Sequence, residues 1–173
     1  NFVPEDRHYH GLFKIRSISS NTTSALLASR EMGKVDMNRR HQREISQQYA
    51  DKFRTKIVSL DDLIGSLSGG NQQKVVISRA LSTRPKVVIL DEPTRGIDAA
   101  ARSDVYGIIR QLKEEGVAVL MVSSDIEEVV ELADRAITIF QGRINGEFSH
   151  DEISQDALTS ASFGIGHERV VAK

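Results

Sequence analysis

A serine followed by two glycines, Ser68-Gly69-Gly70, stands shortly before a stretch with helical periodicity at residues 75–82. Glycines lack a Cβ, so their backbone N–H groups stay open to a ligand that approaches closely. A helix that begins after them directs its unpaired N–H groups and the positive end of its dipole to the same point. The pattern predicts a binding site for a phosphate-like anion, with the Ser68 hydroxyl as a further donor. A plain N-cap and turn use the same residue types.

Two adjacent carboxylates, Asp91 and Glu92, follow a short apolar run at residues 87–90, 23 positions after Ser68. The run is typical of a strand that is covered on both faces. Ligands of open α/β sheets bind at the carboxyl ends of the strands. A carboxylate there suits Mg²⁺ beside nucleotide phosphates, which we assign to Asp91. The second carboxylate, Glu92, is placed to orient and deprotonate an attacking water.

The elements that must position these residues alternate between strands and helices in the second half of the chain. Such alternation predicts βαβ units and a largely parallel sheet. The strand at 117–122 is expected to be buried like the one at 87–90. The spacing of apolar residues predicts helices at 22–30, 36–55, 75–82, 99–115, 125–133 and 151–162. It predicts strands at 87–90, 117–122 and 136–140, with a hairpin partner at 143–148.

Composition restricts the remaining possibilities. The chain has 173 residues, 23 basic and 24 acidic side chains and no Cys, which excludes disulfides, Cys-ligated zinc and thiol catalysis. The charge balance argues against a dominant nucleic-acid surface. The longest aliphatic stretch, at 117–122, is far shorter than the roughly 20 residues of a membrane-spanning helix. His8 and His10 are interpreted as parts of a solvated loop, and the start without Met indicates a piece of a longer protein.

Three consecutive motifs resemble those of ATP-binding cassette (ABC) ATPases. Residues 67–74 (LSGGNQQK) resemble the signature motif, residues 87–92 (VVILDE) the Walker B strand and residues 95–98 (RGID) the D-loop. The residues of these motifs resemble those in the second cassette of bacterial simple-sugar importers, such as those for ribose, galactose, xylose and arabinose. Residues 3–7 (VPEDR) resemble the Q-loop region of the same cassettes.

The resemblance implies an α/β fold with a parallel-sheet, P-loop NTPase-like core and a mainly helical signature subdomain, incomplete at the N-terminus. It divides the chain into three parts. Residues 1–85 would hold the Q-loop region and the helical signature subdomain, residues 86–148 part of the catalytic core, and residues 149–173 a C-terminal tail.

Two departures from the family pattern bear on the mechanism. A P-loop needs G-x-x-x-x-G-K-[ST], but the one Gly-Lys pair, Gly33-Lys34, is followed by Val35 and preceded by Ala28 at the earlier glycine position. The family's switch histidine is replaced by Ser124, whose hydroxyl cannot bridge a γ-phosphate and water as an imidazole can.

In the family, two cassettes pair head to tail, and each ATP lies between one P-loop and the opposite signature motif. The resemblance therefore implies that Ser68, Gly69, Gly70 and Gln72 contact the γ-phosphate of ATP held by a partner cassette. Asp98 would reach across the same interface. A Gly70→Asp change is expected to nearly abolish hydrolysis by repelling the phosphate.

Asp91, Glu92 and Ser124 would belong to this chain's own ATP site, with Asp91 on Mg²⁺. The implied cofactors are ATP and Mg²⁺. The implied partners are a second cassette (the N-terminal half of the same protein or another copy), a membrane permease contacted through residues 17–60, and indirectly an external solute-binding protein, but no nucleic acid. The location would be peripheral, at the cytoplasmic face of the inner membrane. The isolated chain is expected to be inactive.

Other functions remain open at this level. One is a cassette ATPase without a transport role, acting in translation or DNA repair, and another is a truncated, catalytically inactive interaction module. The residues of this chain do not specify the transported substrate, because selectivity in such importers is set by the permease and the external binding protein. Residues 125–129 and 161–164 loosely resemble importers of the sugar-derived signal autoinducer-2, with ribose importers close behind.

Overall fold

The computed structural model describes residues 1–28 and 39–165. Gly33, Lys34 and the ends of two predicted helices, at 29–30 and 36–38, lie outside the described residues. The chain forms two compact units, Asn1–Val122 and Ser123–Lys173. The three functional parts suggested by the motifs stay a prediction.

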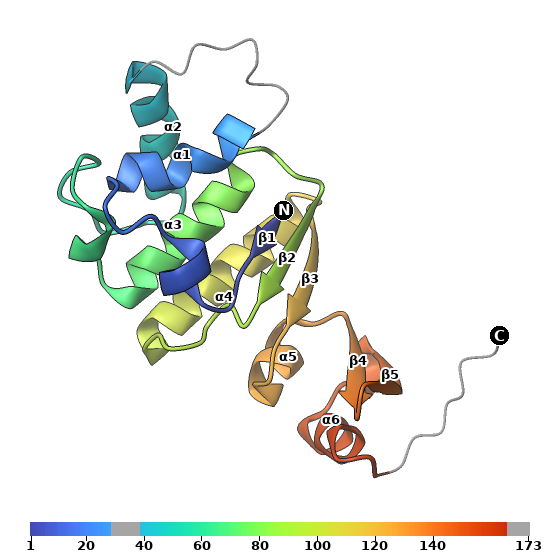
Figure 1. The fold of residues 1–173 in the computed structure, drawn as a ribbon. Helices are drawn as coiled ribbons and strands as arrows, with labels where there is room; N and C mark the ends of the chain where they lie inside the picture. Colours follow the sequence, from blue (N-terminus) through green and yellow to red (C-terminus); the bar gives the residue numbers. More distant parts are fainter. Residues whose placement is uncertain (29–38, 166–173) are drawn as a thin grey trace. The chain divides into compact units, whose positions relative to one another are not determined.

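The first unit contains a parallel sheet of three strands in the order β1-β2-β3 (Figure 1). These strands are β1 (Phe2–Val3), β2 (Val87–Asp91) and β3 (Ala118–Val122). Phe2 pairs with Ile89, and Val87 pairs with Ala118. The two-residue β1 was not predicted, because its apolar residues are cut short by Pro4.

The two faces of this sheet differ in burial. Val88 and Leu90 are fully buried and share a face with their half-buried register partners on β3. The other face carries Leu120 and Val122, with side chains 57% and 52% exposed. The prediction that the strands at 87–90 and 117–122 are covered on both faces is therefore wrong, because among the described residues only one face is packed, and Val87 is 49% exposed.

Of the four long helices in the described part of the first unit, two contact that sheet and the other two pack on one of these. The four helices are α1 (Ile18–Ala28), α2 (Arg39–Lys52), α3 (Gly69–Leu81) and α4 (Ala99–Glu114), which confirms the helices predicted in these regions with shifted ends. α3 contacts β1, α1 and α2, and α4 contacts both β3 and α3. The apolar stripe predicted for α4 is confirmed by its buried residues Val105, Ile108, Ile109 and Leu112.

A small apolar cluster joins α1, α3 and the connection between α2 and α3. Its buried members are Ile18, Leu60, Ile64 and Val75. Two short helices flank it, namely the π-helical turn η1 (Arg7–Gly11) and the 3₁₀ turn η3 (Ile64–Ser66). The cluster therefore fixes the approach of the chain to the start of α3, where the serine and the two glycines lie.

The second unit is an antiparallel hairpin packed on two helices. It contains α5 (Ile126–Leu132), β4 (Arg135–Phe140), β5 (Arg143–Ser149), the 3₁₀ turn η4 (His150–Glu152) and α6 (Gln155–Ser162). β4 pairs with β5 in a separate two-stranded sheet. The prediction of a hairpin is confirmed, but the prediction that residues 136–140 join the parallel sheet is wrong. Ala136, Phe148, Leu158 and Ala161 form the core of this unit.

None of the helices in the described part of the chain combines the length and the apolar character that crossing a membrane requires.

Candidate functional site

The start of α3 presents the predicted anion site. Ser68 has an extended backbone (φ −61°, ψ 159°) and occupies the N-cap position before Gly69. The first backbone bond of the helix runs from the Gln72 N–H to the Ser68 carbonyl, at 2.9 Å. The three amides that precede it have no acceptor inside the helix, because no earlier turn exists. Ser68 is exposed, Gly69 half-buried and Gly70 buried.

The hydroxyl of Ser68 is oriented by a neighbour that sequence reasoning missed. Asn71 Nδ2 donates to Ser68 Oγ at 3.0 Å, and Asn71 Oδ1 accepts from the backbone N–H of Lys56 at 3.0 Å. A hydroxyl whose oxygen accepts from an amide keeps its own hydrogen for another acceptor. The available signal was a polar residue three positions after an N-cap serine, which is the spacing of a capping box.

Gln72 and Gly70 are turned toward the protein rather than toward solvent. The Gln72 side chain is 8% exposed, and its Nε2 donates to the Leu67 carbonyl at 2.9 Å. A Cβ added at Gly70 would lie 2.3 Å from the Cβ of Ala101 on α4. Gly70 is therefore needed for the close approach of α3 and α4, whatever the helix binds.

The paired carboxylates lie where the sequence places them, at the end of β2. Asp91 is the last residue of β2 and pairs in register with Val122. The Glu92 N–H donates to the Val122 carbonyl at 2.8 Å, and Glu92 has a left-handed backbone with φ +46°. Both residues are half-buried. Among the described residues no group of three His, Cys, Asp or Glu side chains could hold a metal. A Mg²⁺ ion at Asp91 would therefore take most of its ligands from phosphate and water.

The side chain of Arg7 holds the backbone of residues 95–98 near the start of α3. Arg7 Nη1 donates to the Arg95 carbonyl at 2.8 Å, and Nη2 donates to the Gly96 carbonyl at 3.0 Å. Arg95 also forms an ion pair with Glu5. The regions at 3–7, 67–74 and 95–98 are thus brought together.

Asp98 is exposed and serves as the N-cap of α4. Its Oδ1 accepts from the Ala101 N–H at 3.0 Å, and this bond lowers the pKa of the Asp98 carboxyl below its ordinary value. A cap of this kind is sufficient to explain an aspartate here. A contact across a cassette interface would be an additional role.

Ser124 belongs to the second unit and is exposed. It stands between two residues that organise the start of α5. Ser123 Oγ donates to Glu128 Oε2 at 2.6 Å, and Asp125 accepts from the N–H groups of Glu127 and Glu128. No side chain that titrates near neutral pH occupies residues 123–125.

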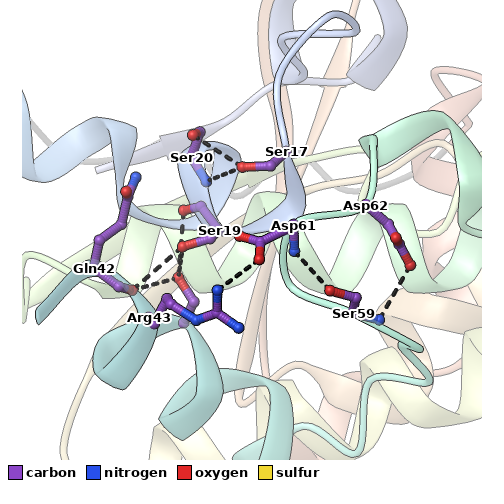
Figure 2. A network of polar contacts seen from close by, with 9 residues as sticks. Ser17, Ser19, Ser20, Gln42, Arg43, Ser59, Asp61 and Asp62 are labelled. Carbon is purple, nitrogen blue, oxygen red and sulfur yellow. Dashed lines mark hydrogen bonds and ion pairs between the residues drawn. The ribbon is translucent and has the colours of Figure 1, made fainter. Parts of the chain in front are cut away.

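A second polar cluster joins α1, α2 and the loop after α2 (Figure 2). Ser19 Oγ lies 3.0 Å from Ser46 Oγ, and Arg43 Nη1 lies 2.5 Å from Asp61 Oδ2. A pocket of about 310 Å³ is lined by Ser17, Ser19, Ser20, Arg39, Gln42, Arg43 and Asp61. The Ser- and Thr-rich stretch at 17–24 was the only sequence signal for this cluster.

Comparisons with known proteins agree with these motifs. The sequence profile of the ABC transporter family matches residues 3–95, which is more than half of the chain. The xylose import ATP-binding protein XylG of Moorella thermoacetica is 41% identical over 162 residues, which cover 94% of this chain and 32% of that protein. The chain therefore spans about a third of the length of this curated relative.

Solved structures show the same fold at low sequence identity. A dimeric post-hydrolysis state of the ATP-binding cassette MJ0796 with ADP and Pi superposes with a TM-score of 0.71 at 21% identity, covering 87% of this chain and 63% of that one. An inward-facing putative metal-chelate type ABC transporter gives 0.75 at 21% identity, with 94% and 63% covered. Together with the family profile and the sequence relative, this fold places the chain in the ABC transporter family.

Proposed function

We propose that this chain is part of the second ATP-binding cassette of a sugar importer and that it supplies the signature motif to ATP held by a partner cassette. The observation that carries the proposal is the open start of α3, where an exposed Ser68 hydroxyl precedes three amides without intrahelical acceptors. The sugar class is supported by the 41% identity to a xylose import ATP-binding protein.

The residues present fit an anionic ligand better than they fit a complete hydrolytic site. Ser68 and the amides of Gly69 and Gly70 suit a terminal phosphate, because donors and the helix dipole act at one point. Gln72 is left out of this set, since its side chain is buried and bonded to Leu67.

On the chain's own side, Asp91 would hold Mg²⁺, whose charge would screen the nucleotide phosphates. Glu92 would orient water. Position 124 holds a serine instead of the family's switch histidine. We therefore assign hydrolysis mainly to the ATP that the partner binds. Because these 173 residues alone contain no P-loop sequence, we expect the isolated chain to be inactive.

Within an importer, the helical segment at 17–60 would contact a membrane permease at the cytoplasmic face of the membrane. The polar cluster of α1 and α2 lies largely in this segment, and its exposed Arg43 offers a charged group for that contact (Figure 2). The transported compound would be a simple sugar or a sugar-like signal, xylose, ribose and autoinducer-2 being the candidates. Selectivity would be set by the permease and the external binding protein.

Two substitutions that each introduce a negative charge test the trans role of the signature. In the intact protein assembled with its permease, Ser68→Glu should lower ATP turnover about 100-fold, because a carboxylate replaces a donor at the phosphate. Ser66→Glu is the matched control, since Ser66 is also exposed and lies two residues earlier in η3.

The control should keep turnover within about twofold of the parent, because surface substitutions away from a site change little. Near-normal turnover of Ser68→Glu would reject the role of the signature. Equal losses in both variants would show that a general charge effect, and not phosphate binding at Ser68, controls turnover.

A further inference from the structure

We propose that Arg7 is a positioning residue that holds the D-loop (residues 95–98) against the signature motif, so that a shift of the Q-loop region is passed to both. This inference rests on the proposed function, because it assigns a device to the same nucleotide-facing surface. It concerns a residue that makes no contact with the reacting groups itself.

The guanidinium group of Arg7 bridges two neighbouring peptide groups. Two of its nitrogens donate to two successive backbone carbonyls, those of Arg95 and Gly96, at 2.8 and 3.0 Å. Such a two-pronged contact needs donors fixed in a planar fork, which only arginine supplies among the side chains. A lysine carries its three donors on one nitrogen at the end of a flexible stem, so it lacks the fixed fork that spans two carbonyls.

The signature motif packs closely around the Arg7 side chain. A Cβ added at Gly69 would lie 2.9 Å from Arg7 Nη2 and 3.7 Å from the Gly96 carbonyl oxygen. The first glycine of the motif therefore leaves the space through which Arg7 reaches the D-loop. On the other side, a Cβ at Gly11 would lie 3.2 Å from the Arg7 Cβ and 3.4 Å from Val76 of α3, so η1 is pressed onto that helix.

Burying the Arg7 side chain at this position has a desolvation penalty. The Arg7 side chain is 9% exposed, and its buried Nε lacks a hydrogen-bond partner in the described structure. Burial lowers the pKa of the guanidinium, which the nearby Asp6 opposes by raising it. An apolar side chain would avoid this desolvation. A buried cation that leaves one donor unsatisfied is consistent with selection for position rather than for stability.

Arg7 contacts the carbonyls of Arg95 and Gly96 and lies close to Gly69. These contacts link motifs that are far apart in the sequence but adjacent in the first unit. Residues 3–7 continue from β1, the D-loop follows β2, and the signature begins α3. The Glu5–Arg95 ion pair adds a second link between the same two segments. Movement of residues 3–7 therefore changes the support of the D-loop carbonyls and of Gly69 together.

Hydrogen exchange on the chain itself tests the link without nucleotide. In Arg7→Met, the amides of residues 96–98 should exchange at least about tenfold faster, since both carbonyl contacts are lost, while those in the middle of α3 should keep their rates. Arg7→Lys should fall between Arg7→Met and the parent. Arg16→Met is the matched control, because Arg16 is exposed and, within the described residues, is bonded only through its backbone. Unchanged rates at 96–98, or a uniform increase through α3, would overturn the inference.

Steady-state kinetics of the intact importer test the consequence. Arg7→Met should lower kcat for ATP about tenfold or more with KM within about twofold, because positioning acts in the closed complex and not on initial binding. Arg7→Lys should restore part of kcat. Equal kcat in Arg7→Met and Arg16→Met would reject a positioning role even if exchange at 96–98 is faster.

The outcomes separate this inference from the proposed function. Failure of the Ser68→Glu test with altered exchange in Arg7→Met would reject the trans signature and leave the link intact. A turnover loss in Ser68→Glu with no effect of Arg7→Met would support the trans signature and reject the link through Arg7.

Discussion

Two adjacent glycines in this chain meet different neighbours. Gly69 leaves room for the Arg7 guanidinium, and Gly70 leaves room for the Cβ of Ala101. From the sequence, both glycines were expected to give a ligand access to the backbone. In the structure, access comes from the position of the amides at the first turn of α3, and the missing Cβ atoms serve internal packing. A Gly70→Asp variant would therefore lose activity for two reasons at once, which is why Ser68→Glu is the cleaner test.

The cap of α4 gives a prediction on acid stability. Because the Ala101 N–H lowers the pKa of Asp98 in the folded chain, Asp98 adds stability above its unfolded pKa of 3.8, and this contribution is lost as the pH falls through the lower folded value. Urea unfolding of the parent and of Asp98→Ala should therefore differ at about pH 6, and this difference should narrow as the pH falls below 3.8. Asp98→Asn, which keeps a neutral N-cap acceptor but not the charge, should lie between the parent and Asp98→Ala at about pH 6. A constant difference between parent and Asp98→Ala across this range would contradict the assignment.

At the scale of elements, the α3–α4 contact gives a rescue experiment. Gly70→Ala should destabilise the chain by about 1 to 3 kcal/mol, because its Cβ would overlap that of Ala101. Adding Ala101→Gly should recover most of this loss, since the space is restored and the helix-propensity changes nearly cancel. Urea unfolding of the two single variants and the double variant measures the coupling. Additive effects would show that the two positions do not touch.

A second contact between these helices is an asymmetric ion pair. Lys74 Nζ lies 2.8 Å from Asp104 Oδ2, and the Lys74 side chain is 5% exposed while that of Asp104 is 59% exposed. Asp104→Ala should cost about 2 kcal/mol, because within the described residues it leaves a buried cation with the Arg54 carbonyl at 3.4 Å as its one partner. Lys74→Met should cost less than about 1 kcal/mol, since the remaining carboxylate is solvated. Thermal or urea unfolding checks the order, and the reverse order would contradict this account.

The elements with long periodic patterns were predictable, and those defined by tertiary pairing were not. The stripe of α4 and the hairpin after Phe140 follow from local spacing and from the Gln141-Gly142 turn, whose φ angles are +48° and +76°. The sheet order depends on a two-residue strand at Phe2–Val3, which no local pattern identifies. β4 was assigned to the wrong sheet because an apolar run does not reveal its partner.

The candidate site shows the same limit. Residue types and spacing predicted Ser68, Asp91 and Glu92 at the ends of elements, where the structure has them. The roles of Arg7 and Asn71 could not be predicted, because each depends on atoms from distant segments. The trans contacts of the motif stay a prediction.

At the scale of the molecule, the first unit exposes an apolar sheet face. Leu120 and Val122 lie on it with more than half of each side chain accessible. Replacing both by lysine should change the unfolding free energy of this chain by less than about 1 kcal/mol, because little apolar contact is lost. The double variant should also self-associate less at high concentration, since the apolar patch is removed.

Sedimentation and urea unfolding measure these two effects. Leu90→Ala is the contrasting variant, because Leu90 is fully buried on the opposite face and should cost about 2 to 5 kcal/mol. A comparable loss of stability in the lysine variant would show that the outer face is packed in solution.

The backbone of Glu92 has a consequence for anyone who evolves this chain in the laboratory. A non-glycine residue at φ +46° carries conformational strain that glycine avoids and asparagine tolerates. Libraries screened for heat resistance alone would consequently enrich the substitutions Glu92→Gly and Glu92→Asn. Such selection would discard the carboxylate beside Asp91, so thermotolerant clones need a separate screen for turnover.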